Sequence, residues 1–355
     1  MRAVAITILV FLSILALPLL FDRERRPQPS DSELRRAALE HNLLPVPKER
    51  EEMKRLYEKH WNVIDEKRVA LGRKLFFDTR LSKEDSVSCA SCHLLDEGGD
   101  DNRPTAIGYH GRVNPFHLNS PTVLNASLAK REFWDARAKD VEEQARGPIT
   151  APFEMNMSPD ELITKLKKTE YPKEFEEVFG KDSLGFDNLC TAIGAYERTL
   201  LTRSSFDDFL DGNDSALSPE AKKGLHLFID RGCKGCHTGM GVGGLLVKRF
   251  PLRRYLPDYM GLDWNDGISL KKDEIPFDNV GGFKGRNGSY FFRVPILRNV
   301  ALTSPYFHNG AIKELKEAIR IMSKYQLGDE FDDEEIAAVE AFLKSLSGKI
   351  VDYGY

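Results

Sequence analysis

The chain has 355 residues, of which 41% are hydrophobic and 30% charged, and its 55 acidic and 51 basic side chains give a formal net charge of −4. This composition is typical of a folded protein and excludes collagen-like and wholly disordered chains; the length suits about two domains of ordinary size. Because Lys and Arg form no long block, the sequence does not predict nucleic-acid binding, which needs a clustered basic surface.

The first residues predict export across a membrane. Arg2 is followed by residues 3–21, which contain no charged side chain. This apolar run is longer than the ~7–15 residues usual in a signal peptide and has no clear cleavage site before Asp22, so a cleaved signal and an uncleaved anchor both stay open. We therefore expect residues 1–22 to form a signal peptide or membrane anchor, followed by a tether over residues 23–50 with a short helix at 32–41.

The rest of the chain predicts a mainly α-helical protein. Helical patterns cover residues 51–74, running on into 75–77, and residues 158–169, 186–201 and 333–346. The last of these begins with a capping box of Asp and Glu three residues apart. We see no convincing sheet, although short strands around residues 290–294 stay open.

One pattern occurs twice. The sequence Gly-x-x-Leu-Phe-x-Asp stands at residues 72–78 and again at 224–230. Duplication of a small domain explains the repeat most simply. We therefore expect one domain over residues 51–204 and a second over residues 205–355.

Each copy of the repeat leads into a Cys-x-x-Cys-His pentapeptide, at residues 89–93 and 233–237. Two thiols one turn apart can bond both vinyl groups of one porphyrin, and the adjacent His then reaches the iron. A redox dithiol or half of a zinc site would share this spacing, but two copies in an exported chain favour haem. We therefore expect two covalent c-type haems, held by Cys89, Cys92, His93, Cys233, Cys236 and His237. The fifth cysteine, Cys190, is expected to be an inert core thiol.

The sixth iron ligand decides what such a haem does. A haem with two strong protein ligands carries electrons, whereas one with an open or displaceable position can react with peroxide. The remaining His and Met residues are the candidates for the second ligands.

Further short blocks follow one another between about Val69 and Gly348. They are Leu-Phe-Phe-Asp at 75–78, Asn-Ser-Pro-Thr-Val-Leu-Asn at 119–125, Phe-Trp-Asp at 133–135, Glu-Met-Asn-Met-Ser at 154–158, Phe-Arg-Val-Pro at 292–295, Thr-Ser-Pro-Tyr-Phe-His-Asn-Gly at 303–310 and Leu-Lys-Glu-Ala-Ile-Arg-Ile-Met at 315–322. In this order the sequence resembles the bacterial dihaem cytochrome c peroxidases and their MauG-type relatives.

The resemblance implies two cytochrome c-like helical domains, each around one haem. It implies that His93 is the proximal ligand of the peroxidatic haem, and that His237 and Met322 ligate the haem that collects electrons. A thioether ligand favours ferrous iron and a high reduction potential. MauG-type enzymes resemble this chain but have Tyr at the position of Met322, so Met322 favours the peroxidase branch.

The resemblance also implies roles for residues outside the haem motifs. Glu154 and Gln144 match the acid–base residues at which a proton moves between the two peroxide oxygens. Trp134 matches an aromatic residue between the haems, although a core Trp would explain its presence equally well. A calcium ion is implied between the domains, with oxygen ligands from Asn119, Thr303 and Pro305.

One position departs from the family pattern. Relatives commonly carry a His that caps the peroxidatic iron until the other haem is reduced, and here that position is Tyr109. The neighbouring His110 is the best candidate for such a distal iron ligand. Because some relatives lack the capping His, activation by reduction stays open for this chain.

Together these features predict an enzyme that reduces hydrogen peroxide to water in the periplasm, at or near the membrane. Electrons would come from a small exported cytochrome c or a cupredoxin. Two alternatives stay open: a dihaem electron-transfer cytochrome without catalysis, and a MauG-like oxidase. We expect no nucleic-acid partner, and a homodimer is an open option.

Overall fold

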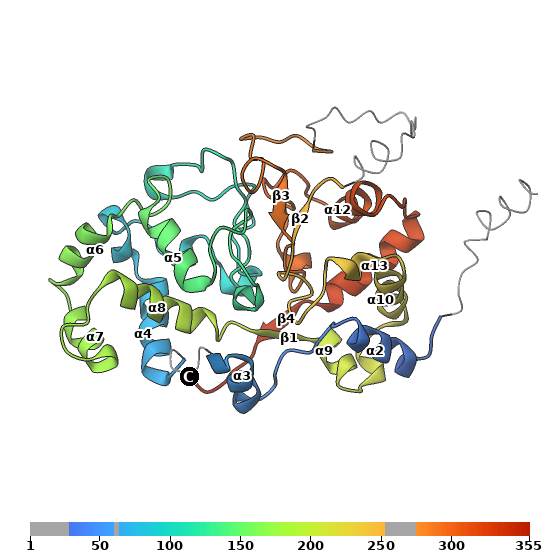
Figure 1. Ribbon diagram of the computed structural model, residues 1–355, viewed down its shortest axis with the longest axis horizontal. Coiled ribbons are helices and arrows are strands. Elements are labelled where there is room, and N and C mark those ends of the chain that lie inside the picture. Colours follow the sequence, from blue (N-terminus) through green and yellow to red (C-terminus); the bar gives the residue numbers. More distant parts are fainter. Residues whose placement is uncertain (1–27, 60–63, 253–274) are drawn as a thin grey trace, which may run out of the picture. The chain divides into compact units, whose positions relative to one another are not determined.

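A computed structural model of the chain describes residues 28–59, 64–252 and 275–355. The compact unit considered below comprises residues 31–355. The predicted signal or anchor, residues 1–22, lies outside the described residues. Among the residues that are described, no helix is long and apolar enough to span a membrane. The unit is largely helical, with small antiparallel sheets (Figure 1).

In the first half of the unit, α4 (Glu66–Phe77) packs against α8 (Phe186–Glu197). The two helices approach so closely that a Cβ atom on Gly72 would lie 1.8 Å from the backbone oxygen of Ala192. Only glycine fits at such a crossing. Around it lies an apolar core that also contains Cys190, which is fully buried as expected.

The second half repeats this arrangement. The helix α10 (Pro219–Asp230) packs against α13 (Asp333–Ser345). Here a Cβ atom on Gly224 would lie 1.9 Å from the backbone oxygen of Ala338. The repeated glycine of the sequence is therefore the contact point of two equivalent helix pairs, which Figure 1 shows at opposite ends of the unit.

The predicted helices are confirmed with one correction. The helix expected over residues 51–74 is two helices, because α3 (Arg50–Leu56) ends before α4 begins at a new N-cap, the Asp65 side chain, which accepts the Arg68 N–H. The capping box predicted for α13 is present, as is one at Ser158 for α6. The other α-helices within the described residues are α2 (Asp31–Glu40), α5 (Val141–Thr150), α6 (Pro159–Leu166), α7 (Tyr171–Phe179), α9 (Ser205–Leu210) and α12 (Leu315–Met322).

Part of the segment expected as a tether is folded. The helix expected at residues 32–41 is α2, and its Leu34 and Ala38 are buried in one core with residues of α9 and α10. Leu43 joins the same core. Burial of these apolar side chains stabilises the segment against the second half of the unit.

The strands join segments that are distant in the sequence. Strand β1 (Thr202–Ser204) pairs with β4 (Gly348–Ile350), and β2 (Val247–Arg249) pairs with β3 (Phe291–Arg293), both antiparallel. The sequence showed no convincing sheet, and these two small sheets correct that reading; the strand left open near residues 290–294 is present as β3. Behind β1, Arg298 and Asp207 form a fully buried ion pair with Nη1–Oδ2 and Nη2–Oδ1 distances of 2.7 and 2.8 Å.

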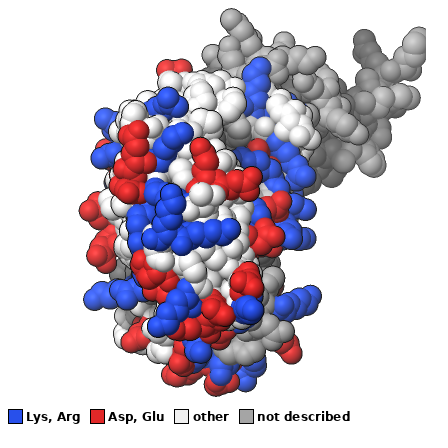
Figure 2. All heavy atoms as spheres, turned by 90° about the vertical axis from the view of Figure 1, so that its left-hand side faces the viewer, with Lys and Arg blue, Asp and Glu red and all other residues white. Residues whose placement is uncertain are grey.

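Charges of both signs cover the end of the unit that carries α6 and α7. Figure 2 shows Lys and Arg interleaved with Asp and Glu on this face. Lys74 Nζ lies 2.7 Å from carboxylate oxygens of both Glu170 and Glu174, and Arg80 Nη2 lies 2.9 Å from Glu170. Exposed pairs of this kind contribute roughly 0–1 kcal/mol each, so this face is held mainly by the core beneath it.

Candidate haem sites

The first Cys-x-x-Cys-His motif forms a single tight turn. Residues Cys89–Ser91 make a 3₁₀ turn, and the His93 N–H donates to the Cys89 carbonyl at 3.1 Å. His93 Nδ1 lies 3.0 Å from the Gly99 carbonyl, which can only accept, so Nδ1 carries the proton and Nε2 is left to bind a metal. Burial lowers the pKa of His93 and keeps the ring neutral, as a ligand must be.

The second motif forms the same backbone turn, although His237 Nδ1 has no hydrogen-bond partner among the described residues. Residues Cys233–Gly235 form a 3₁₀ turn, and the His237 N–H donates to the Cys233 carbonyl at 2.9 Å. Burial lowers the pKa of His237 to about 4, although the carbonyls of Pro295 and Val242 lie near enough to oppose the shift. All five cysteines are described, and each has a free thiol. Both motifs therefore present two thiols and a neutral imidazole from one turn.

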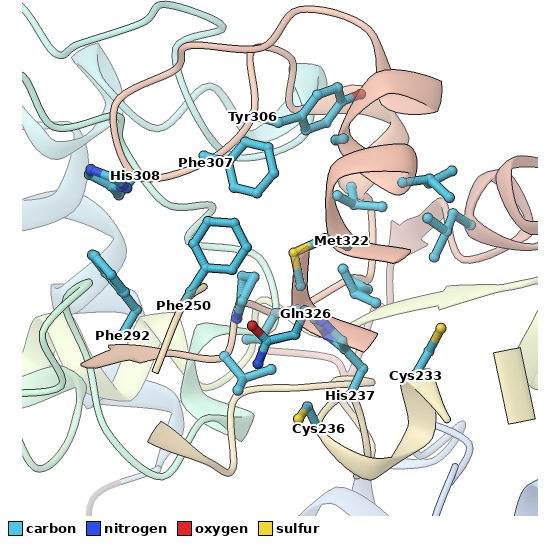
Figure 3. A pocket seen from close by; sticks show the side chains of 18 of the residues that line it. Cys233, Cys236, His237, Phe250, Phe292, Tyr306, Phe307, His308, Met322 and Gln326 are labelled. Carbon is cyan, nitrogen blue, oxygen red and sulfur yellow. The ribbon is translucent and has the colours of Figure 1, made fainter. Parts of the chain in front are cut away.

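A cavity of about 240 Å³ opens beside the second motif. Cys233, Cys236 and His237 line one side, and Met322, the last residue of α12, lines it from the facing helix (Figure 3). The walls are mainly apolar and include Phe228, Phe250, Ile296, Phe307, Leu315 and Ile319. An apolar cavity with two thiols, an imidazole and a thioether on its walls fits a c-type haem with His and Met ligands.

Trp134 lines the same cavity and is fixed by hydrogen bonds. Its Nε1–H donates to the Asn119 carbonyl at 2.9 Å, and its own carbonyl accepts the Arg293 N–H at 2.8 Å. The ring packs edge to face against His308, with 6.4 Å between ring centroids. His308 in turn has Nε2 at 2.8 Å from Asn279 Oδ1, and thus packs against Trp134 with a polar partner of its own.

Glu154 lies in the turn that follows α5, close to the first haem motif. Its ionised carboxylate adds to burial in raising the pKa of Cys92 to about 12. Burial raises the pKa of Glu154 itself to about 7, and Arg137 opposes this shift. Gln144 is half-buried on α5, the helix that leads into this turn. The fold thus brings an acid that titrates near neutral pH to the side of the first motif.

A loop that contacts the Glu154 backbone contains Tyr109 and His110. The Tyr109 N–H donates to the Glu154 carbonyl at 2.7 Å. The rings of Tyr109 and His110 stack with their centroids 4.1 Å apart. His110 Nε2 lies 2.7 Å from Glu84 Oε2, and the His110 side chain is 55% exposed. In this conformation His110 faces Glu84 at the surface.

The residues expected to bind calcium meet at one wall of the cavity. Asn119, Thr303 and Pro305 all line it, and the Asn119 amide nitrogen lies 2.6 Å from the Pro305 carbonyl. No cluster of three or more His, Cys, Asp or Glu side chains forms a metal site within the described ranges. A cation here would therefore depend on carbonyl and amide oxygens, which suit calcium.

Sequence reasoning did not single out the charged residues buried near this wall. Asp100 lines the cavity and is 1% exposed, and burial with the nearby Asp101 raises its pKa to about 7. Arg293 lines the cavity from β3, and Glu132 is buried beside it. Arg293 stands in the block Phe-Arg-Val-Pro, and a charged residue among apolar ones was the sequence feature that could have indicated a buried charge.

Comparison with known proteins agrees with this geometry. The family model described as di-haem cytochrome c peroxidase matches residues 66–215. A cytochrome c551 peroxidase of Pseudomonas aeruginosa is 43% identical over 293 residues, which cover 81% of this chain and 80% of the relative. The methylamine utilization protein MauG of Methylorubrum extorquens is 34% identical over 263 residues, covering 73% of this chain and 69% of the relative.

A solved structure supports the fold. The crystal structure of a MauG-like protein associated with microbial copper homeostasis superposes with a TM-score of 0.67, covering 93% of this chain and 96% of that chain at 23% identity. The fold and the two motifs thus define a protein of the dihaem c type. The chain belongs to the di-haem cytochrome c peroxidase family and is a peroxidase, and membership of this family implies two c-type haems.

Proposed function

We propose that this chain reduces hydrogen peroxide to two molecules of water, consuming two electrons and two protons. In this proposal, Cys89, Cys92 and His93 hold the haem that supplies the iron for cleavage of the oxygen–oxygen bond. The observation that carries it is the position of Glu154, a half-buried acid near enough to Cys92 to act on its thiol, with a pKa that burial raises to about 7. An acid with this pKa can both take up and release a proton at neutral pH.

Proton transfer is the role of Glu154. Its carboxylate takes the proton from one peroxide oxygen and returns it to the other, so that the leaving oxygen departs as water rather than as hydroxide. Partial burial supports this role because it brings the pKa of Glu154 near neutral pH. Gln144 is neutral and positions peroxide by hydrogen bonding from α5.

Electrons enter at the second site. His237 and Met322 would hold the haem there, and a thioether ligand would give it the high potential needed to accept electrons from a donor. Trp134, held at the wall of this cavity by Asn119 and Arg293, would assist transfer of these electrons toward the first haem site. The donor in this proposal is a small exported cytochrome c or a cupredoxin.

Each half of the unit forms one haem domain in this proposal, residues 51–204 around the peroxidatic haem and residues 205–355 around the electron-transfer haem. Calcium binds at Asn119, Thr303 and Pro305 and holds the wall of the cavity. The protein works in the periplasm after export through its apolar N-terminal segment.

The test is steady-state oxidation of a reduced small c-type cytochrome by hydrogen peroxide. We expect Glu154→Gln to lower kcat at least about 100-fold, the lower bound usual for loss of a general acid–base group. Glu176→Gln removes an exposed carboxylate from α7 and is the matched control, with kcat unchanged. Wild-type turnover by Glu154→Gln would refute the assigned role. A wild-type protein with both haems and no peroxide turnover would instead favour an electron-transfer cytochrome.

A further inference from the structure

Arg293 is a buried arginine, and two of its side-chain nitrogens have no hydrogen-bond acceptor among the described residues. It ends β3, its side chain is 5% exposed, and it lines the cavity of His237 and Met322. Across the described part of the chain, its Nε and Nη1 find no hydrogen-bond acceptor. Buried donors without acceptors are rare because the cost of removing them from water is not recovered. These donors therefore point to an acceptor that the polypeptide does not provide.

Glu132 is the carboxylate beside Arg293, but the two are not closely paired. Glu132 Oε2 lies 3.8 Å from Arg293 Nη1, beyond hydrogen-bond distance, and Glu132 Oε1 likewise has no partner among the described residues. The buried pair of Arg298 and Asp207 in the same unit differs, with distances of 2.7 and 2.8 Å. In that pair Arg298 and its hydrogen bonds hold the pKa of Asp207 below its usual range against the effect of burial.

The pKa of Glu132 shows that it is paired less closely with Arg293 than Asp207 is with Arg298. Burial raises it to about 7, Arg293 opposes the rise and Asp140 adds to it. Glu197, also buried, faces Glu132 from α8. A guanidinium fully committed to Glu132 would hold this pKa low, as Arg298 does for Asp207. Arg293 is therefore only partly engaged by Glu132.

The backbone fixes where Arg293 lies in the cavity. Arg293 pairs with Val247 across the β2–β3 sheet, and its N–H donates to the Trp134 carbonyl at 2.8 Å. Its neighbour Phe292 lies across the cavity from Cys233 in Figure 3. A porphyrin attached through its vinyl edge to Cys233 and Cys236 would carry its two propionates on the opposite edge of the ring.

We propose that Arg293 binds a propionate of the haem attached at Cys233 and Cys236, with Glu132 as a second carboxylate behind the guanidinium. This rests on the proposed haem at the second motif. The planar fork of arginine binds a carboxylate through two parallel hydrogen bonds. Its positive charge offsets the negative propionate in a buried site where charges interact strongly. Arg293 therefore stabilises the ferrous state and raises the reduction potential of this haem.

The test is a potentiometric titration that resolves the two haems by their visible spectra. We expect Arg293→Gln to lower the one-electron equilibrium constant of the His237 haem about tenfold, which corresponds to about 59 mV. Arg293→Lys keeps the charge and should retain most of the potential. Arg286→Gln removes an exposed arginine from the segment before β3 and should change neither haem. Resonance Raman spectra should show a shifted propionate mode in Arg293→Gln only.

Haem content measured on the same samples separates the two levels of the proposal. If the wild-type protein carries no haem at Cys233 and Cys236, the proposed function fails. If it carries that haem and Arg293→Gln changes neither the potential nor the propionate mode, only the role of Arg293 is refuted.

A second variant decides the matter if Arg293→Gln does not fold. Glu132→Gln keeps the shape of the side chain and removes the competing negative charge. We expect it to raise the potential of the His237 haem above pH 7, where Glu132 is ionised. An unchanged or lower potential would refute the proposal.

Discussion

His110 Nε2 lies 2.7 Å from Glu84 Oε2, and Tyr109 donates its hydroxyl to the other oxygen of the same carboxylate at 3.1 Å. One acid thus holds both Tyr109 and His110. This contact keeps the His110 ring at the surface in the conformation described here.

The first prediction concerns this contact. If His110 is a distal iron ligand, Glu84→Gln should release it and increase the six-coordinate, low-spin fraction of the first haem in the all-ferric protein. His110→Ala should abolish that fraction. A high-spin first haem whose spectrum is unchanged by either variant would show that His110 does not cap the iron. Glu176→Gln serves again as the control for loss of an exposed carboxylate.

The second prediction is a pH dependence set by Glu154. Its carboxyl is protonated below a pKa of about 7 and cannot then accept a proton from peroxide. We therefore expect kcat/KM to fall as pH drops through about 7, and to level off above it. Stopped-flow measurements over this range should show the acid limb in the wild type and its loss in Glu154→Gln. An acid limb that survives in the variant would assign the titration to another group.

Burial of Glu154 also predicts how stability changes with pH. Because its folded pKa lies above the ordinary value of 4.5, the folded state binds the proton more tightly than the unfolded state. The contribution to the free energy of unfolding is then full below about 4.5 and is lost as pH rises to about 7. The free energy of unfolding, measured by denaturant titration at each pH, should be plotted against pH for wild type and Glu154→Gln. The two curves should differ in slope within this pH window and run parallel outside it.

The third prediction concerns Met322. Met322→Leu removes the thioether that faces the second motif, so the ferrous state loses its preferred ligand. We expect the potential of that haem to fall by more than about 59 mV, which is a tenfold change in its one-electron equilibrium. Met53→Leu changes a buried methionine in another core and is the matched control. Equal potentials in the two variants would show that Met322 is only a packing residue.

The fourth prediction concerns the helix crossings. Gly224→Ala places a methyl group where the Ala338 backbone oxygen lies 1.9 Å away, so α10 and α13 must separate. Overpacking of this kind costs roughly 1–3 kcal/mol, although alanine is otherwise the better helix former. Gly185→Ala, whose Cβ atom would meet no atom closer than 3.9 Å, should be near neutral. Chemical denaturation measures both; equal stabilities would contradict the close crossing.

Several features of this protein follow from local sequence alone. A Cys-x-x-Cys-His turn is complete within five residues, so both haem motifs and their tight turns could be predicted without any tertiary contact. Helices with strong caps, such as α13 with its Asp332 capping box, were predicted for the same reason. The repeated Gly72 and Gly224 indicated a duplication, but the reason for glycine there is a contact between helices distant in the sequence.

Tertiary structure alone decided the rest, because burial and charge depend on segments far apart in the chain. The pKa of Glu154 depends on its burial near Cys92 and on Arg137, and the sequence alone would leave it an ordinary surface acid. Arg293 and Glu132 come together only when β3 meets the segment of Trp134. The sequence by itself thus determined the cofactor and the class of chemistry, while the fold decided which carboxylates are buried and which donors still need an acceptor.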